Sequence, residues 1–170
     1  MASGSPCALI GPPAGTATAG AALSSRVDGS SPVISYLIAA FDDTTVENLD
    51  QGIRLEDYAG GGIKVQFLAV AASATSGNAE FEAAIARKQA AGDDIDSAHT
   101  FDFNASGAVA VAGTAGVPFA VEITFTNGAD MDSLADGEFG VLRIRRNTSV
   151  SGDATGDCQI LLDSIVIVEA

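Results

Sequence analysis

Three consecutive glycines stand before an alternating segment in LEDYAGGGIKVQF, residues 55–67. A phosphate-binding loop needs Lys and Ser or Thr after its last glycine, and it opens a helix whose N-terminus holds the phosphate. Here no GK[ST] follows, and residues 63–67 alternate as a strand does. Glycines before a strand instead supply positive φ or room for close backbone approach. The stretch predicts no cofactor site but a structural turn into a long strand, built from Tyr58, Gly60, Gly61 and Gly62.

Catalytic acid, base and nucleophile groups are sparse. His99 is the only histidine, and no serine lies in a G-x-S-x-G elbow, so one chain cannot build a Ser-His-Asp triad or a multi-histidine metal site. Carboxylate pairs exist, namely Glu80 with Glu82, and Asp42 and Asp43 with Glu47. Glycosidase sites add aromatic platforms for the sugar ring, and this chain has no Trp and two Tyr. We therefore predict solvated strand charges, no catalytic residue and no enzymatic activity.

Two acidic clusters could hold calcium, and neither has a matching ligand pattern. The first contains Asp93, Asp94 and Asp96. The second, Asp130, Asp132, Asp136 and Glu138, begins like an EF-hand. However, Leu134 stands where the third ligand belongs, and Gly137 comes two residues late. We predict turn and capping roles for these carboxylates, with no metal and no cofactor.

The charge balance limits the partners. The chain of 170 residues has 22 acidic and 8 basic residues and a formal net charge of -14, so it would repel nucleic acid. No apolar run is long enough to span a bilayer, and the first basic residue is Arg26, so we expect neither a membrane segment nor a signal peptide. Cys7 and Cys158 are far apart in sequence, which predicts free thiols. The expectation is a soluble protein made in the cytoplasm.

The basic residues are concentrated in one place. Three of the eight lie in VLRIRR, residues 141–146. Alternation places Leu142 and Ile144 on one face of a strand, and Arg143 and Arg145 on the other. Their partners are carboxylates either on an adjacent strand or across a subunit interface, and the sequence favours neither. The candidate subunit-interface residues are Arg143, Arg145 and Arg146.

The organisation of the chain is that of an all-β protein behind an arm. Residues 1–32 are mostly Ala, Gly, Ser, Thr and Pro, which predicts an extended arm that orders against a neighbouring subunit, or else a disordered leader. Residues 33–170 contain short strands separated by turns, which predicts an antiparallel β-sandwich or jelly roll of about eight strands. We expect strands over 33–41, 63–71, 79–88, 98–103, 108–112, 119–126, 139–146 and 159–169, and a helical turn over 130–136.

The segment AEFEAAIARKQAAG, from residue 79, has two interpretations. Its alanines and the terminal Gly92 suit a helix. Its alternation, with Glu80 and Glu82 on one face and Phe81 and Ile85 on the other, suits a strand, which we favour.

The order of several motifs resembles that of jelly-roll virion proteins of tailed bacteriophages. Those proteins have a strand that ends in Phe and an acidic turn, an Arg-x-x-x-Tyr-x-Gly-Gly segment, a SATSG turn, and a late G-[DE]-x-x-x-L-R-[IV]-R-R strand. The corresponding residues here are Arg54, Tyr58, Gly60, Gly61, 73–77, Gly137, Glu138 and 142–146. The similarity covers about residues 33–169. Glu80 stands beside Phe81 where the family more often has a bulky aromatic residue.

The resemblance implies a virion structural protein. It suggests a capsid decoration, or cement, protein on the outer surface of the head, bound to the major capsid protein and to copies of itself, with a homotrimer expected. The alternative is a tail or fibre module that binds host glycans through polar loops such as 73–78.

Overall fold

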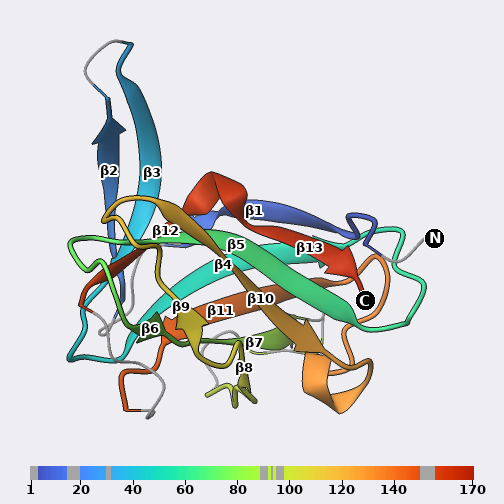
Figure 1. Cartoon of the computed structure of the whole chain (residues 1–170). Helices are drawn as coiled ribbons and strands as arrows, with labels where there is room; N and C mark the ends of the chain where they lie inside the picture. The colour runs from blue at the N-terminus through green and yellow to red at the C-terminus, as the bar shows by residue number, and fades with distance from the viewer. Residues whose placement is uncertain are drawn as a thin grey trace.

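The computed structural model describes residues 4–14, 20–29, 32–88, 92, 94, 98–149 and 156–170. Two antiparallel sheets face each other across one core (Figure 1). Sheet A contains, in spatial order, β10 (Pro118–Phe125), β5 (Ile63–Ala71), β12 (Cys158–Leu161), β3 (Ile34–Phe41) and β2 (Ala22–Asp28), and β13 (Val166–Glu169) also pairs with β5. Sheet B contains β1 (Ala8–Ala14), β4 (Glu47–Leu55), β11 (Phe139–Arg146), β7 (Phe81–Lys88) and β8 (Asn104–Ala105). A small third sheet pairs β6 (Asn78–Ala79) with β9 (Val109–Ala110).

The strand order is that of a jelly roll, as the sequence predicts. The chain alternates between sheets through β3, β4, β5 and β7, and again through β10, β11 and β12. In each sheet a late strand lies between two early ones: β12 separates β3 from β5, and β11 separates β4 from β7. Two Greek keys wound together produce this interleaving. The two sheets hold eleven strands. If β12 and β13 are taken as one interrupted strand, the strands of these sheets from β3 onward number eight, and β1 and β2 each add a strand at one sheet edge.

The core lies between the sheets and is filled by the inward residues of alternating strands. On β10 the burial pattern alternates along the whole strand, and β11 shows the same period. Three phenylalanines meet at the centre: the ring of Phe81 lies edge-on to Phe41 at 5.9 Å and to Phe67 at 5.4 Å between centroids. Edge-to-face contacts of this kind stabilise a core beyond the burial of area alone.

The N-terminal segment differs from the arm expected over residues 1–32. Strand β1 pairs with β4, and β2 pairs with β3 of the same chain. Just before β1, the N–H of Cys7 donates to the Ile167 carbonyl of sheet A at 3.0 Å, and just before β2, the N–H of Ala21 donates to the Asn48 carbonyl of sheet B at 2.9 Å. Each connection crosses from one sheet to the other. Cys7 and Ala21 are buried. The described N-terminal residues therefore pack against the sandwich of their own chain.

The predicted strands are largely confirmed, and the structure departs from the prediction at residues 98–103, in the final strand, in the helical turn and at β4. The ambiguous segment from residue 79 is a strand, because Phe81 and Ile85 face the core. The strand predicted over residues 98–103 is wrong, because these residues form no strand. Their alternation instead places Phe101 and Phe103 over two arginines. The final strand is interrupted by the 3-10 turn η2 (Leu162–Ser164), and the helical turn expected over 130–136 is the shorter η1 (Ala129–Met131). Strand β4 was not predicted.

The hairpin of β2 and β3 extends beyond the body of the sandwich (Figure 1). Strand β12 reaches β3 only from Ile38 to Phe41. Residues 34–37 therefore pair with 25–28 alone among the described strands. We call these eight residues the projecting ribbon. In the part of the chain that the structure describes, no helix is long and apolar enough to cross a membrane.

Candidate functional site

The outward face of sheet B is organised in rows that cross the strands. On β11, Phe139, Val141, Arg143 and Arg145 point outward, because Leu142 and Ile144 between them are buried. The register places Arg54 and Lys88 beside Phe139, Gly52 and Ala86 beside Val141, Asp50 and Ala84 beside Arg143, and Asn48 and Glu82 beside Arg145. One row thus carries glycine and other small side chains, while the next rows carry charge.

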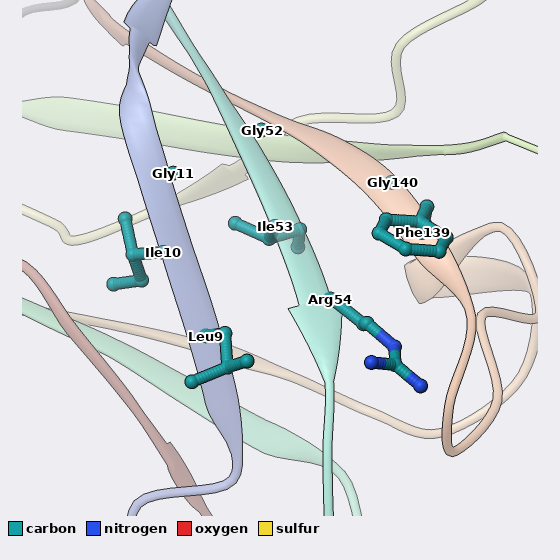
Figure 2. A pocket seen from close by; sticks show the side chains of 8 residues that line it. All are labelled: Leu9, Ile10, Gly11, Gly52, Ile53, Arg54, Phe139 and Gly140. Carbon is teal, nitrogen blue, oxygen red and sulfur yellow. The ribbon is translucent and has the colours of Figure 1, made fainter.

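The row of small residues leaves a groove across β1, β4 and β11. Its floor is the backbone of Gly11 and Gly52, and its walls are Leu9, Arg54 and Phe139 (Figure 2). We call it the glycine-floored groove, and its volume is about 410 Å³. A Cβ on Gly52 would meet no atom within 4 Å, so space, not strain, is what this glycine provides. Leu9 and Phe139 are 58% and 60% exposed, which leaves their apolar side chains without cover.

Among the described residues that line the groove, Arg54 is the only charged one. Its guanidinium lies 5.3 Å from the centroid of the Phe139 ring. The same side chain pairs with Glu56 at 2.7 Å, and its Nε donates to the Gly137 carbonyl at 3.1 Å. These contacts hold the cation at the rim, so the groove is apolar inside and close to neutral at its edge.

Beside the groove, two arginines form a ladder with carboxylates of the neighbouring strands. Arg143 holds Asp50 of β4 through two hydrogen bonds of 2.6 Å, and Arg145 holds Glu82 of β7 at 2.6 Å. The hydrogen bonds that Arg143 donates to Asp50 raise the pKa of its guanidinium above the ordinary value. The sequence left open whether these partners lie on an adjacent strand or in another subunit, and the structure places them on adjacent strands.

Two aromatic rings cover this ladder. The guanidinium carbon of Arg143 lies 4.0 Å from the centroid of Phe101, and that of Arg145 lies 3.6 Å from Phe103. Stacked and paired in this way, both arginines are occupied within the chain. The segment from residue 98 therefore covers the outer face of sheet B at these two arginines of β11.

Arg146, the third candidate interface residue, lies elsewhere. It is fully buried, on the inward side of β11, and one of its terminal nitrogens donates to the Gly156 carbonyl at 2.9 Å. Its burial makes it a structural cation of this chain, out of reach of a neighbouring surface.

The glycine triplet forms the predicted turn, and the requirement for glycine is strictest at Gly62. Gly62 has φ of 98°, and a Cβ there would lie 2.6 Å from the Phe125 carbonyl oxygen. Its N–H donates to the Tyr58 hydroxyl at 3.0 Å, while the N–H of Ala59 donates to the buried Glu169 at 3.0 Å. Gly61 needs no positive φ, and a Cβ there would make only ordinary contact with Glu169. Gly60 also has a positive φ, 95°, but a Cβ there would make only ordinary contact with Asn127. Gly62 is therefore the residue at which both the backbone conformation and the available space require glycine.

The predicted carboxylate pairs are held in turns and ladders. Glu82 belongs to the arginine ladder. The carboxylate of Asp42 accepts the N–H of Thr44 at 2.7 Å and of Thr45 at 3.0 Å. The hydroxyl of Thr44 contributes most to lowering the pKa of Asp42. Asp42, Asp43 and Asp157 bring their oxygens within 4.8 Å of one another, but Asp157 also accepts a backbone N–H, from Asp43. Local turn formation accounts for the arrangement.

The carboxylates of the second acidic cluster accept backbone hydrogen bonds, but only that of Asp130 is a local turn contact of the kind expected, while Asp132 and Asp136 bind distant segments. Asp130 accepts the N–H of Thr126 at 2.6 Å, Asp136 accepts that of Tyr58 at 2.9 Å, and Asp132 accepts that of Arg87 at 2.8 Å. Glu138 pairs with the Arg87 side chain, and this bond is the main cause of a lowered pKa of Glu138. Each of these four carboxylates thus has a hydrogen-bond or ion-pair partner within the chain. Of the first cluster, Asp93 and Asp96 lie outside the described residues.

The remaining candidates have structural surroundings. His99 is exposed and contacts the ammonium of Lys88. Both cysteines are free and buried. Burial, and then the nearby Glu169 carboxylate, raises the pKa of Cys7 to about 11, so its thiol is a weak nucleophile at neutral pH.

Sequence reasoning missed the glycine-floored groove because its parts come from three distant strands. Gly52 lies in a segment that was not recognised as a strand, and Leu9 lies in the expected arm. One residue of the groove could have been noticed in the sequence. Phe139 is a large apolar residue on the same face of the predicted strand as Arg143 and Arg145. Together with the exposed Leu9 on the other side of the groove it forms an apolar patch, and an exposed apolar patch indicates a contact surface.

No family model and no curated protein matches the chain. Among solved structures, it is similar to the CBM22-1 xylan-binding domain of Xyn10C from Paenibacillus barcinonensis, with a TM-score of 0.39 and 12% identity, over 92% of this chain and 90% of that chain.

Proposed function

We propose that this chain is a non-enzymatic structural protein of a tailed-phage virion, a decoration protein that binds the outer surface of the major capsid protein. Its partners are then the capsid shell and other copies of itself, with a trimer as the expected stoichiometry. It is made in the host cytoplasm and resides on the outside of the head. Its acidity suits that place, away from packaged DNA.

The glycine-floored groove is the observation that carries this proposal. Leu9 and Phe139 stand exposed on either side of a floor without side chains. An uncovered apolar groove with a polar surround is typical of a protein contact surface. The resemblance of residues 33–169 to virion jelly rolls points the same way. Three of the described carboxylates, Asp50, Glu82 and Asp130, are held by hydrogen bonds within the chain.

A second candidate function, glycan binding by a tail or fibre module, is favoured by one feature. The exposed ring of Phe139 lies beside the Arg54 guanidinium, and a sugar ring can stack on an aromatic face while a cation binds its hydroxyls. Sugars, however, need several convergent hydrogen-bonding groups. The lining of the groove offers one polar side chain, so an apolar protein segment suits it better.

Particle composition tests the proposal. Heads purified from the phage that encodes this chain should contain it in fixed proportion to the major capsid protein. Heads made without it should unfold at a lower temperature, and purified protein should restore the difference. Absence of the chain from heads, together with a positive signal on a host glycan array, would replace the proposal with the second candidate.

A further inference from the structure

A further pocket lies on the outer face of sheet A, where the projecting ribbon meets the sandwich. Val70 and Leu161 point outward from this sheet, because their neighbours Ala69 and Ile160 belong to the core. They are nevertheless only 1% and 7% exposed. Side chains of the ribbon and residues at the start of β10 surround them and leave a pocket of about 250 Å³. An apolar pocket enclosed in this way by its own chain has the form of a small-molecule site.

The walls of this pocket are mainly apolar and carry one cation. Leu68 of β5 and Pro118 of β10 extend the apolar surface, and Val27 and Tyr36 of the ribbon lie on the other side. Among the described residues that line the pocket, Arg26 is the only charged one, and it stands opposite Tyr36 in the pairing of β2 with β3. We call it the Arg26 pocket. A ligand inside it meets apolar surface on most sides and a guanidinium on one.

The guanidinium of Arg26 is held in place without being neutralised. One terminal nitrogen donates to the side-chain oxygen of Gln159 at 2.8 Å. The other lies against Gly116, where a Cβ would stand 2.5 Å from it. Gln159 is uncharged, and among the described side chains Arg26 has no carboxylate partner, since the ion pairs formed there use other cations. A guanidinium has five N–H donors, so several remain for a ligand.

These features favour a carboxylate on a small apolar body. A carboxylate matches the fork of a guanidinium and forms charge-assisted hydrogen bonds with it. A doubly charged phosphate would be repelled more strongly by a chain of net charge -14. Sugars need several convergent hydrogen-bonding groups, and apolar side chains form most of these walls. The volume is below the range of about 300 to 1,000 Å³ that is typical of drug-sized ligands, so the body must be small.

We propose that the Arg26 pocket binds a small apolar monocarboxylate, with the carboxylate on Arg26 and the apolar body against Val70 and Leu161. Such a ligand contacts the ribbon and the sandwich together, so its binding fastens the projecting ribbon to the body of the protein. The pocket lies on sheet A, whereas the glycine-floored groove lies on sheet B. The inference therefore goes beyond the proposed function and does not depend on it.

Titration of the full chain with benzoate tests the proposal, and benzamide is the neutral control ligand of nearly the same shape. Binding is followed by NMR at the Gly116 backbone amide and the Gln159 side-chain amide, which flank the guanidinium. Benzoate should shift both signals to saturation and raise the melting temperature, because it binds the folded chain. Benzamide should bind at least tenfold more weakly. Equal binding of the two ligands, or no saturable shift with benzoate, overturns the proposal.

Variants assign the binding to this cation. Arg26→Met removes the charge and keeps the apolar stem, and it should weaken benzoate binding at least tenfold. Arg54→Met makes the same change in net charge at a guanidinium that already pairs with Glu56, and it should leave the affinity unchanged. Equal affinities of wild type and Arg26→Met overturn the proposal.

A second pair of variants keeps every charge. Gly116→Ala places a Cβ where the Arg26 terminal nitrogen now lies, so it should displace the guanidinium and weaken benzoate binding. Gly113→Ala is the matched control, at another exposed glycine of the same loop with open space around its Cα, and it should bind as wild type does. Thermal unfolding establishes that each variant folds. Equal affinities of the two alanine variants would contradict the position assigned to the carboxylate.

Asp28, two residues after Arg26 on β2, is the carboxylate nearest to it in sequence. The benzoate titration is therefore repeated with Asp28→Asn. Similar affinities of wild type and this variant support a site that is open in the native chain. Binding that appears only in Asp28→Asn would mean that the chain supplies its own carboxylate, and it would overturn the proposal.

Discussion

Arg143 and Asp50 face each other across β11 and β4 and share two parallel hydrogen bonds of 2.6 Å, from Nε to Oδ1 and from a terminal nitrogen to Oδ2. Each side chain is about one quarter exposed, and Phe101 stacks on the guanidinium. Two-pronged, partly shielded pairs of this kind are stronger than solvated ones. The pair links β4, in the first third of the chain, to β11, in the last third.

Replacing Arg143 with Met should therefore lower the free energy of unfolding by about 2 kcal/mol, because Asp50 loses both donors and Phe101 loses its cation. For a chain of this size, the melting temperature should fall by roughly 4 to 8 °C. Lys64→Met is the control, since Lys64 and Glu122 form a more exposed pair at 3.1 Å. We expect less than about 1 kcal/mol there. Equal losses in the two variants would contradict the special role of the ladder.

The turn before β5 gives a second prediction. Gly62→Ala should cost roughly 3 kcal/mol, because a left-handed backbone disfavours a Cβ and the Phe125 carbonyl blocks its position. Gly61→Ala should cost under about 1 kcal/mol. Chemical denaturation of both variants measures the difference. A larger loss at Gly61 than at Gly62 would contradict the structure of the turn.

The sequence predicts those strands whose pattern of apolar residues is visible within the strand itself. The alternation of β5, β7, β10 and β11 is visible in the sequence because one face of each strand is buried. Strand β4 escapes prediction because Gly52 and several polar residues dilute its pattern: Gln51 is buried, and its side-chain amide donates to the Gly11 carbonyl. The burial of the polar Gln51 is explained only by the neighbouring strand β1, which supplies its hydrogen-bond partner.

The N-terminal residues show the other limit. Ala, Gly, Ser and Pro are typical of mobile segments, and that composition predicts an arm. Their order here comes from backbone hydrogen bonds to strands distant in sequence, such as Cys7 to Ile167. Small side chains suit this role because they let the chain cross between two sheets. Composition cannot distinguish a flexible arm from a strand that pairs at a sheet edge. The difference depends on whether a distant strand of the same chain offers hydrogen bonds to the segment.

Cys7 predicts a specific pH dependence. Its folded-state pKa is raised from 9.0 to about 11 by burial and by Glu169. Above pH 9 the unfolded chain releases this proton while the folded chain keeps it, so stability is complete below pH 9 and falls as the pH rises toward 11. Thermal unfolding from pH 8 to 11 should show a steeper decline for wild type than for Cys7→Ala. Parallel curves for the two proteins would contradict a buried, neutral Cys7.

The central claim is that the glycine-floored groove attaches this protein to its assembly. The most direct measurement is the binding of purified wild type, Gly52→Phe and Gly113→Phe to heads that lack the protein. Because Gly52 has open space around its Cα, Gly52→Phe should keep or raise the melting temperature. We predict saturating binding for wild type and Gly113→Phe, and at least tenfold weaker binding for Gly52→Phe, since about 1.4 kcal/mol of lost contact is enough for that. Equal binding of all three would contradict the claim.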